Sequence, residues 1–358
     1  MRAVAGVAGV ILIALMLAEF FVTYLLPRRV RRDPRIARGL NRLLWRPWRA
    51  IAGRLSPSSA DTMLGIFGPF ALVFQLLIWT TGLIFGFALL EYAAVGHAFG
   101  HGLLFSSGLF LSAEGASGST LVHVIGLVEA ATAIGVLFIV IGYLPAVYGA
   151  FSRREVAVSQ LGTRAGSPPS AGAILLRTMD RERWLGLERD LRDWEAWVAE
   201  LMETHLSYPL LGFYRSQHVN QNWLAALTVM TDVAAFVTAV ESDDEVEAAE
   251  LTYAIGQHAL SDLALQYRIT AGEADRLSEE HFEQLYGLVR GALSNPVSCE
   301  EAKKRLTKLR RAYEPKARGL ARALALDLPP WVTPKDQESE LMRLPGVRVG
   351  RVSRDLVG

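Results

Sequence analysis

The stretch HGLLFSSGLFLSAEGASGSTLVHVIGLVEAATAIGVLFIVIGYLPAVYG, from His101 to Gly149, decides the fold of this chain. It consists of a short apolar segment at 102–111, a break rich in Gly and Ser, and a long apolar segment at 121–149. About ten apolar residues are too few to cross a bilayer, which takes about 20 in helical form. Irregular backbone at membrane depth must be buried in protein or line a water-filled cavity. The pattern therefore predicts a re-entrant helix, a loop and a spanning helix, which is the sequence outline of a pore loop.

Composition places part of the chain in lipid. Of its 358 residues 51% are hydrophobic, and the mean hydropathy is +0.25, above the usual range of soluble domains. The single cysteine, Cys299, excludes an internal disulfide and fits a reducing compartment for the C-terminal half. The sequence contains no P-loop, dinucleotide fingerprint, nucleophile elbow or zinc-protease helix. We therefore expect no enzymatic activity, no cofactor and no metal.

Two further apolar runs predict spanning helices. Residues 1–26 contain a nearly uninterrupted apolar run, and residues 63–92 form another after the polar break SPSSADT. A cleaved signal peptide is the alternative for the first run, but the run is longer than usual and has no small-residue cleavage site at its end. Its one carboxylate, Glu19, is close to a cluster of arginines, which favours an interfacial position.

The linker at 27–60 is strongly basic and contains a single carboxylate, Asp33. By the positive-inside rule it is cytoplasmic, so the N-terminus lies outside and the chain crosses the plasma or inner membrane. Apolar residues recur there every three or four positions, as in a helix lying in the headgroup plane. We expect anionic lipid headgroups, and not nucleic acid, as its partner, because it directly follows a spanning helix. The expected membrane-surface residues are Arg38, Arg42, Trp45, Arg46 and Trp48.

Residues 63–155 resemble the two-helix, pore-loop core of the potassium-channel superfamily, in the bacterial branch with a cytosolic extension. Phe105-Ser106 stands where those channels have a Phe-Ser entry to the pore helix. The resemblance implies a homotetramer with an outer helix at 63–92, a pore helix and filter at 102–118 and an inner helix at 121–149. The family filter, Thr-x-Gly-Tyr-Gly-Asp, aligns without a gap with Ser112, Ala113, Glu114, Gly115, Ala116 and Ser117.

This filter lacks the tyrosine and the paired glycines of the family. Shifting the alignment by one residue puts Gly115-Ala116-Ser117 in place of Gly-Tyr-Gly and does not restore them. Glycines allow the backbone conformations that point successive carbonyls at the ion. We therefore expect passive conduction of monovalent cations with altered or weak selectivity, with a ring of Glu114 carboxylates at the pore entrance. The alternative is a non-conducting scaffold that anchors the cytosolic domain in the membrane.

The inner helix carries three further candidate residues. Glu129 either faces an aqueous cavity or pairs with a polar side chain such as His123 or Gln75. Gly135 and Gly142 are either hinges of the inner helix or positions where helices cross closely.

The remaining chain predicts a helical cytosolic domain. We expect a short strand at 155–161, a linker at 156–175, the domain at 176–330 and an irregular tail at 331–358. The helices are expected at 180–205, 221–240, 243–267, 273–293 and 299–326, from their apolar periodicity. The segment 205–223 either lines a ligand pocket or joins two helices, and the ligand or protein partner of the domain is unknown. The predicted fold is an all-α integral membrane protein with three transmembrane helices and a re-entrant pore helix, followed by an α-helical cytosolic domain.

Overall fold

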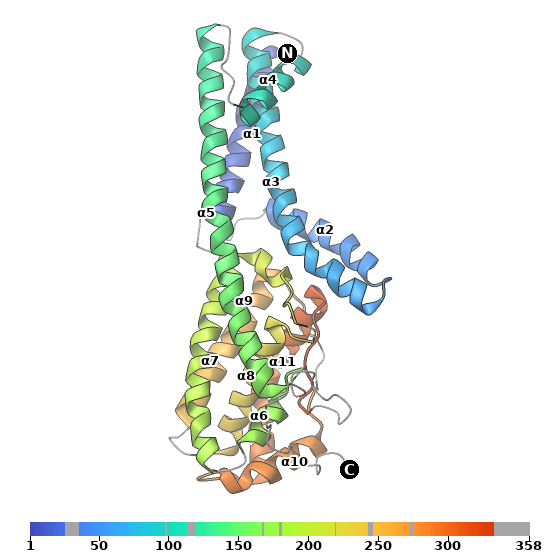
Figure 1. Cartoon of the computed structure of the whole chain (residues 1–358), viewed down its shortest axis with the longest axis vertical. Helices are drawn as coiled ribbons and strands as arrows, with labels where there is room; N and C mark the ends of the chain where they lie inside the picture. Colours follow the sequence, from blue (N-terminus) through green and yellow to red (C-terminus); the bar gives the residue numbers. More distant parts are fainter. Residues whose placement is uncertain are drawn as a thin grey trace, which may run out of the picture. The chain divides into compact units, whose positions relative to one another are not determined.

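The computed structural model describes residues 1–25, 36–96, 99–112, 119–166, 168–178, 181–218, 220–242, 246–272 and 275–332. Helices dominate these residues, and the only β-type pairing among them is an isolated bridge between Glu241 and Pro296. The expected all-α class is confirmed for this part of the chain (Figure 1). The chain divides into two compact units, unit 1 at Met1–Gly149 and unit 2 at Ala150–Gly358.

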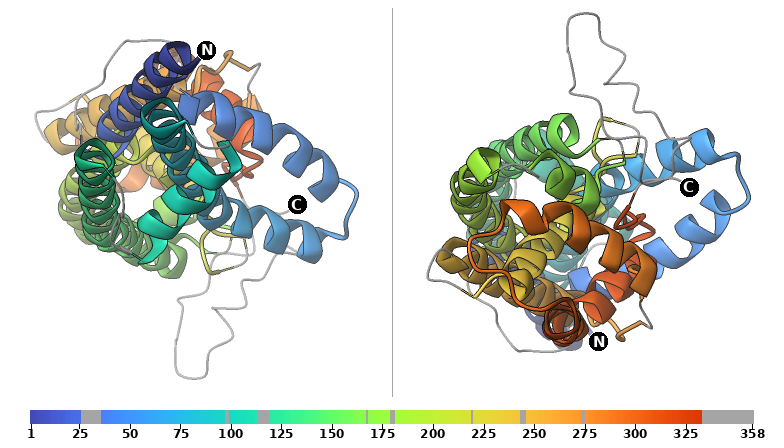
Figure 2. Two further views of the ribbon diagram at one scale, coloured as in Figure 1. Left: turned by 90° about the horizontal axis from the view of Figure 1, so that it is seen from above. Right: turned by 90° about the horizontal axis from the view of Figure 1, so that it is seen from below.

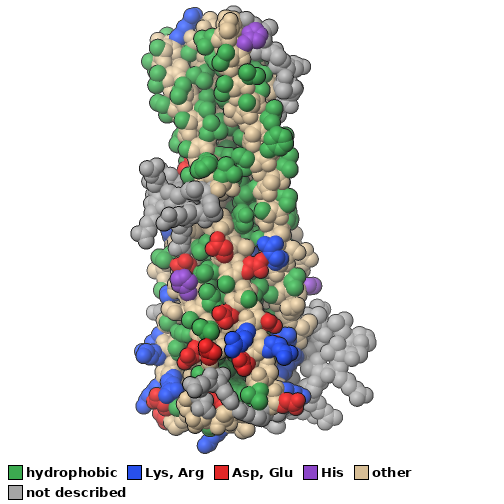
Figure 3. Space-filling view, turned by 90° about the vertical axis from the view of Figure 1, so that its left-hand side faces the viewer, with side chains coloured by type: hydrophobic (Ala, Val, Ile, Leu, Met, Phe, Trp, Pro, Cys, Tyr) green, Lys and Arg blue, Asp and Glu red, His purple; other side chains and the backbone are tan. Residues whose placement is uncertain are grey.

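Unit 1 is built from long apolar helices. These are α1 (Arg2–Phe20), which continues as a π-helical turn (Phe21–Leu25), α3 (Pro57–Val95) and α5 (Thr120–Ala165), whose last turns belong to unit 2. Each is long and apolar enough to cross a membrane by length and composition. On the face in Figure 3, unit 1 presents mainly hydrophobic side chains, whereas acidic and basic ones gather over unit 2.

Helices α1 and α3 pack closely because glycines face each other. A Cβ built on Gly9 would lie 2.7 Å from the carbonyl oxygen of Gly86, and one built on Gly86 would lie 2.6 Å from Cγ1 of Ile13. Small residues at such crossings let two helix backbones approach within the reach of van der Waals contacts. Further along, Met16 of α1 packs with the buried Trp79 of α3.

Helix α3 begins earlier than expected. The predicted break at 56–62 forms its first turns, because Pro57 occupies the first helical position, where its fixed φ suits a helix and its missing N–H is not needed. The helix therefore has 39 residues, about 58 Å at 1.5 Å per residue. Figure 1 shows a bend in α3, and Pro69, inside this helix, cannot donate to the helix ladder. Helix α2 (Ile36–Ala52) lies beside the first part of α3, as the two views in Figure 2 show.

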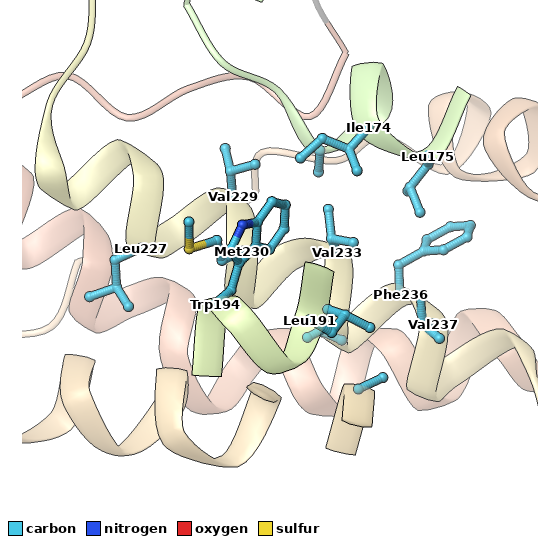
Figure 4. Close-up of a cluster of buried hydrophobic side chains, with 14 of the residues drawn as sticks. Ile174, Leu175, Leu191, Trp194, Leu227, Val229, Met230, Val233, Phe236 and Val237 are labelled. Carbon is cyan, nitrogen blue, oxygen red and sulfur yellow. The ribbon is translucent and has the colours of Figure 1, made fainter. Parts of the chain in front are cut away.

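Unit 2 surrounds one apolar helix, α8 (Trp223–Val240), which is buried almost completely. A helix that is apolar on all sides must be covered all round. The covering helices are α6 (Ala171–Arg177), α7 (Arg181–Ser207), α9 (Glu247–Tyr267) and α11 (Cys299–Leu324), and α10 (Glu279–Val289) packs against α6 and α11. Figure 4 shows this core, with Leu191 and Trp194 of α7 near Met230 and Val233 of α8.

The predicted strand at 155–161 is wrong, because α5 continues as a helix to Ala165. Val158, Leu161 and Ala165 are buried at steps of three and four residues, which is helical spacing. The alternation EVAVSQL has only seven residues, which is too short to distinguish the two-residue period of a strand from the 3.6-residue period of a helix. Glycine at 166, with φ +85°, ends the helix. The expected linker at 156–175 therefore holds the end of α5 and most of α6.

Candidate functional site

A short apolar helix, α4 (Phe99–Ser112), lies between α3 and α5 in the chain. The expected helix at 102–111 is confirmed and has one more turn at its start. Its 14 residues measure about 21 Å, which is less than the roughly 30 Å hydrocarbon core of a bilayer. It packs on α3 at Gly102, where an added Cβ would lie 3.2 Å from the carbonyl oxygen of Ala88.

Two buried carboxylates and one buried hydroxyl come together around α4, and we call them the carboxylate site (Glu91, Ser106 and Glu129). The hydroxyl of Ser106 on α4 donates a hydrogen bond of 3.2 Å to Glu129 on α5. Glu91 on α3 is 6% exposed, and its Oε2 lies 3.7 Å from a Cβ built on Gly102. The site thus joins three consecutive helices of unit 1.

Neither carboxylate is fully satisfied. The Oε1 atoms of Glu91 and Glu129 are buried without a hydrogen-bond partner among the described residues. Ionisable residues inside apolar helices are costly, usually face the interior of a helix bundle and often mark function. The carboxylate site is therefore the strongest candidate functional site of unit 1.

Of the alternatives for Glu129, pairing with a polar neighbour fits better than an aqueous cavity, because its side chain is fully buried within the chain. The partner is Ser106, which the sequence singled out only as part of the Phe105-Ser106 motif. Gln75 instead donates a hydrogen bond of 2.5 Å to the amide oxygen of Asn41 on α2. The ring of His123 contacts the carbonyl oxygen of Ser119. The available signal was that Glu91 is near the C-terminal end of one apolar helix and Glu129 is near the N-terminal end of the next, and these ends meet when the two helices run antiparallel.

The candidate filter is only partly within the described residues. Ser112 is the last residue of α4. Ala113, Glu114, Gly115, Ala116 and Ser117 lie outside the residues that the structure describes. The ring of Glu114 carboxylates therefore stays a prediction.

Gly135 and Gly142 lie within the unbroken helix α5, on one face and two turns apart. A Cβ built on either residue would meet no heavy atom within 4 Å. Neither glycine is therefore at a helix crossing among the described residues of this chain, and their role as hinges stays a prediction.

The expected membrane-surface residues of α2 divide into two groups. Arg42 and Arg46 are exposed and Arg38 is half-buried. The tryptophans, expected at the lipid surface, instead pack on α3: Trp45 is 4.7 Å from Phe67 between ring centroids. Trp48 stacks on Phe70 and donates its Nε1–H to the carbonyl oxygen of Met63 at 2.9 Å. This differs from the expectation because Met63, Phe67 and Phe70, in the predicted part of α3, provide a surface for α2.

Glu19 stabilises the start of α2. Its carboxylate accepts a hydrogen bond of 3.1 Å from the backbone N–H of Ile36, the first residue of that helix. The first N–H groups of a helix have no partner inside the helix, and the positive end of the helix dipole favours a carboxylate there. The charge that stood out in the first apolar run therefore acts as a helix cap.

In unit 2, the segment 205–223 is organised by Arg154, which is buried. Its guanidinium donates to the carbonyl oxygens of Leu211 at 2.9 Å and Tyr214 at 3.0 Å, and pairs with Glu155 at 2.8 Å. The ring of His205 lies beside it, and burial together with the positive charge of Arg154 lowers the pKa of His205 to about 3. This favours a helix connection over a ligand pocket. The sequence pattern did not indicate this role of Arg154.

A second buried network joins α8 to α11. Arg276 pairs with Asp232 at 2.7 Å and with Glu314 at 2.8 Å. Tyr313 donates its hydroxyl to Asp232 at 2.5 Å. These groups pair with one another in the core, as buried charges must, although Oδ2 of Asp232 has no hydrogen-bond partner among the described residues. The sequence did not indicate the network, because Arg276 and Tyr313 are 44 and 81 residues away from Asp232.

Comparisons of the chain with family models, curated proteins and solved structures found no match. Among the described residues, no group of three or more His, Cys, Asp or Glu side chains could hold a metal ion. The function is therefore inferred from the helices and contacts described above.

Proposed function

We propose that this chain is a subunit of a pore-loop channel that passes monovalent cations across the cell inner membrane with weak selectivity. The observation that carries the proposal is α4, a short apolar helix held between two long ones. It contacts α3 through Gly102 and α5 through the hydrogen bond from Ser106 to Glu129. Outer helix, re-entrant helix and inner helix follow in the same order in the potassium-channel superfamily, which residues 63–155 resemble.

In this proposal α1, α3 and α5 span the membrane, and α8 is the core of a cytoplasmic domain. The N-terminus lies outside, and the arginine-rich segments on the cytoplasmic side follow the positive-inside rule. Four copies surround the pore, and the Glu114 side chains form an acidic ring that favours cations without a carbonyl filter.

The test is ion flux into liposomes containing the full chain. We expect flux of monovalent cations, and a several-fold lower cation-to-anion permeability ratio for Glu114→Gln. Glu300→Gln, an exposed position at the start of α11, is the charge-matched control and should leave the ratio unchanged. An unchanged ratio in Glu114→Gln contradicts the acidic ring.

The second candidate is a non-conducting scaffold that anchors unit 2. It is supported by the degenerate filter sequence and by the size of unit 2, which has a core of its own. A tetramer that gives no flux in either direction under any salt gradient or pH supports the scaffold and contradicts the channel.

A further inference from the structure

Helix α2 has three distinct faces. The first packs on α3 and contains Ala37, Trp45, Trp48 and Ala52, of which all but the half-buried Trp48 are buried. The hydrogen bonds from Gln75 to Asn41 and from Ile36 to Glu19 further fix α2 within unit 1. The helix is therefore held in one orientation about its own axis.

The second face is aliphatic and exposed. Leu43 is 69% exposed and Ile51 is 49% exposed. With Pro47 between them, they recur every four residues and so share one side of the helix. Solvent-exposed aliphatic side chains in a row indicate a surface that meets something apolar.

The third face carries exposed arginines, Arg42, Arg46 and Arg49. These recur at steps of four and three residues, on the side of the helix away from Leu43 and Ile51. No acidic residue occurs in α2 to offset them. A helix with an aliphatic face and a separate arginine face fits the boundary between acyl chains and anionic headgroups.

We propose that α2 is a membrane-surface helix whose aliphatic face enters the acyl chains of one leaflet and whose arginine face binds anionic phospholipid headgroups. Trp45 and Trp48 hold α2 on α3 and do not anchor it in lipid. A nucleic acid would use the arginines but would leave the aliphatic face uncovered, so the exposed leucine and isoleucine favour lipid. The proposal is independent of whether the pore conducts.

The first test measures lipid retention by the full chain. The protein is purified from a mixture of phosphatidylcholine and phosphatidylglycerol, and the bound lipids are counted by native mass spectrometry. Each surface arginine is worth about a fivefold preference for anionic lipid, so R42Q/R46Q/R49Q should lower the phosphatidylglycerol excess at least tenfold. The control K304Q/K308Q/R311Q removes the same charge from exposed positions of α11 and should retain the excess. Equal retention by the two variants overturns the proposal.

The second test measures depth, so that it does not depend on arginine substitutions. In a C299S background, spin labels at L43C and R46C are compared in nanodiscs by their accessibility to oxygen and to a water-soluble reagent. We expect the label at 43 to lie in the acyl region and the label at 46 at the headgroup level. A label at L185C, on an exposed position of α7, should report water. Two labels on α2 that are equally accessible to water overturn the proposal, as does arginine-dependent binding of duplex DNA without a preference for anionic lipid.

Discussion

At the scale of single residues, the most consequential contacts join polar groups that apolar surroundings would otherwise penalise. Ser106 gives the buried Glu129 its hydrogen bond, and Arg154 satisfies the carbonyl oxygens of the connection after α7. In both cases one side chain serves a group far away in the sequence. The sequence indicated Glu129 as a candidate, since it is a carboxylate in an apolar run, but it did not indicate that Ser106 on another helix is its partner.

Ser106→Ala should destabilise unit 1, because it leaves the carboxylate of Glu129 buried with fewer partners. Losing a hydrogen bond to a buried polar group costs about 1–3 kcal/mol, which should lower the midpoint of thermal unfolding in detergent. Replacing both partners, as in S106A/E129L, should be closer to wild type than S106A alone. Ser107→Ala, whose hydroxyl bonds only within its own helix among the described residues, is the control. Equal midpoints for S106A and S107A would contradict this role.

His205 should make unit 2 less stable as the pH falls. Its folded pKa of about 3 lies below the unfolded value of about 6.5, so unfolding takes up a proton between these pH values. The resulting loss is at most about 1.4 kcal/mol per pH unit for one group. His205→Gln should therefore be less stable than wild type at pH 7.5, with a gap in unfolding midpoint that narrows towards pH 5. His258→Gln, at an exposed position, should show no such narrowing, and a constant gap for His205→Gln would refute the assignment.

At the scale of elements, length and apolar periodicity predicted where the helices are, but not where they begin and end. Four helices of unit 2, α7, α8, α9 and α11, lie within a few residues of the predicted ranges, because their apolar patterns are long. Helix α10 begins later than predicted, and α6 was predicted as linker. The start of α3 and the end of α5 were missed. A Pro-Ser stretch can form either a loop or the first turns of a helix, and a short alternation can form either a strand or a helix. Which face of α2 is covered depends on its packing on α3. The local pattern does not show this contact between two helices, and so the tryptophans were assigned to lipid.

Gly86→Leu should separate α1 from α3. No space exists for a side chain between Gly86 and Ile13, and overpacking a close contact costs about 1–3 kcal/mol. We expect a lower unfolding midpoint and weaker disulfide cross-linking between cysteines placed at the α1–α3 crossing. Gly100→Leu is the matched control, because a Cβ there meets no heavy atom within 4 Å. Cross-linking that is unchanged in Gly86→Leu would contradict close packing at this position.

At the scale of the whole molecule, a single sequence does not show which distant residues form contacts. Asp232, Arg276 and Glu314 meet from α8, from the segment before α10 and from α11. The contacts among these three residues depend on the packing of several helices at once. No local sequence pattern predicts that packing. The division into an apolar part and a charged helical part, by contrast, was readable from composition along the chain.

Asp232→Leu should strongly destabilise unit 2, because it leaves Arg276 buried without its closest partner. Breaking a buried ion pair on one side costs about 3–5 kcal/mol. The double variant D232L/R276M should regain part of that loss, since replacing both charges by apolar groups is often neutral. The measurement is chemical denaturation of the full chain followed by far-UV circular dichroism. A double variant that is less stable than Asp232→Leu alone would contradict the prediction, because it would show that the other contacts of Arg276 stabilise unit 2 more than its pair with Asp232 does.

The composition of α8 has a consequence for how the chain is made. This helix is apolar enough to pass for a membrane span, yet α9 and α11, which cover it, are synthesised after it. At about 5–20 residues per second, α8 emerges from the ribosome several seconds before its cover is complete. During that interval it resembles a substrate of the insertion machinery. Early folding against α7, or a chaperone that shields α8, would keep this helix from inserting until its cover is made.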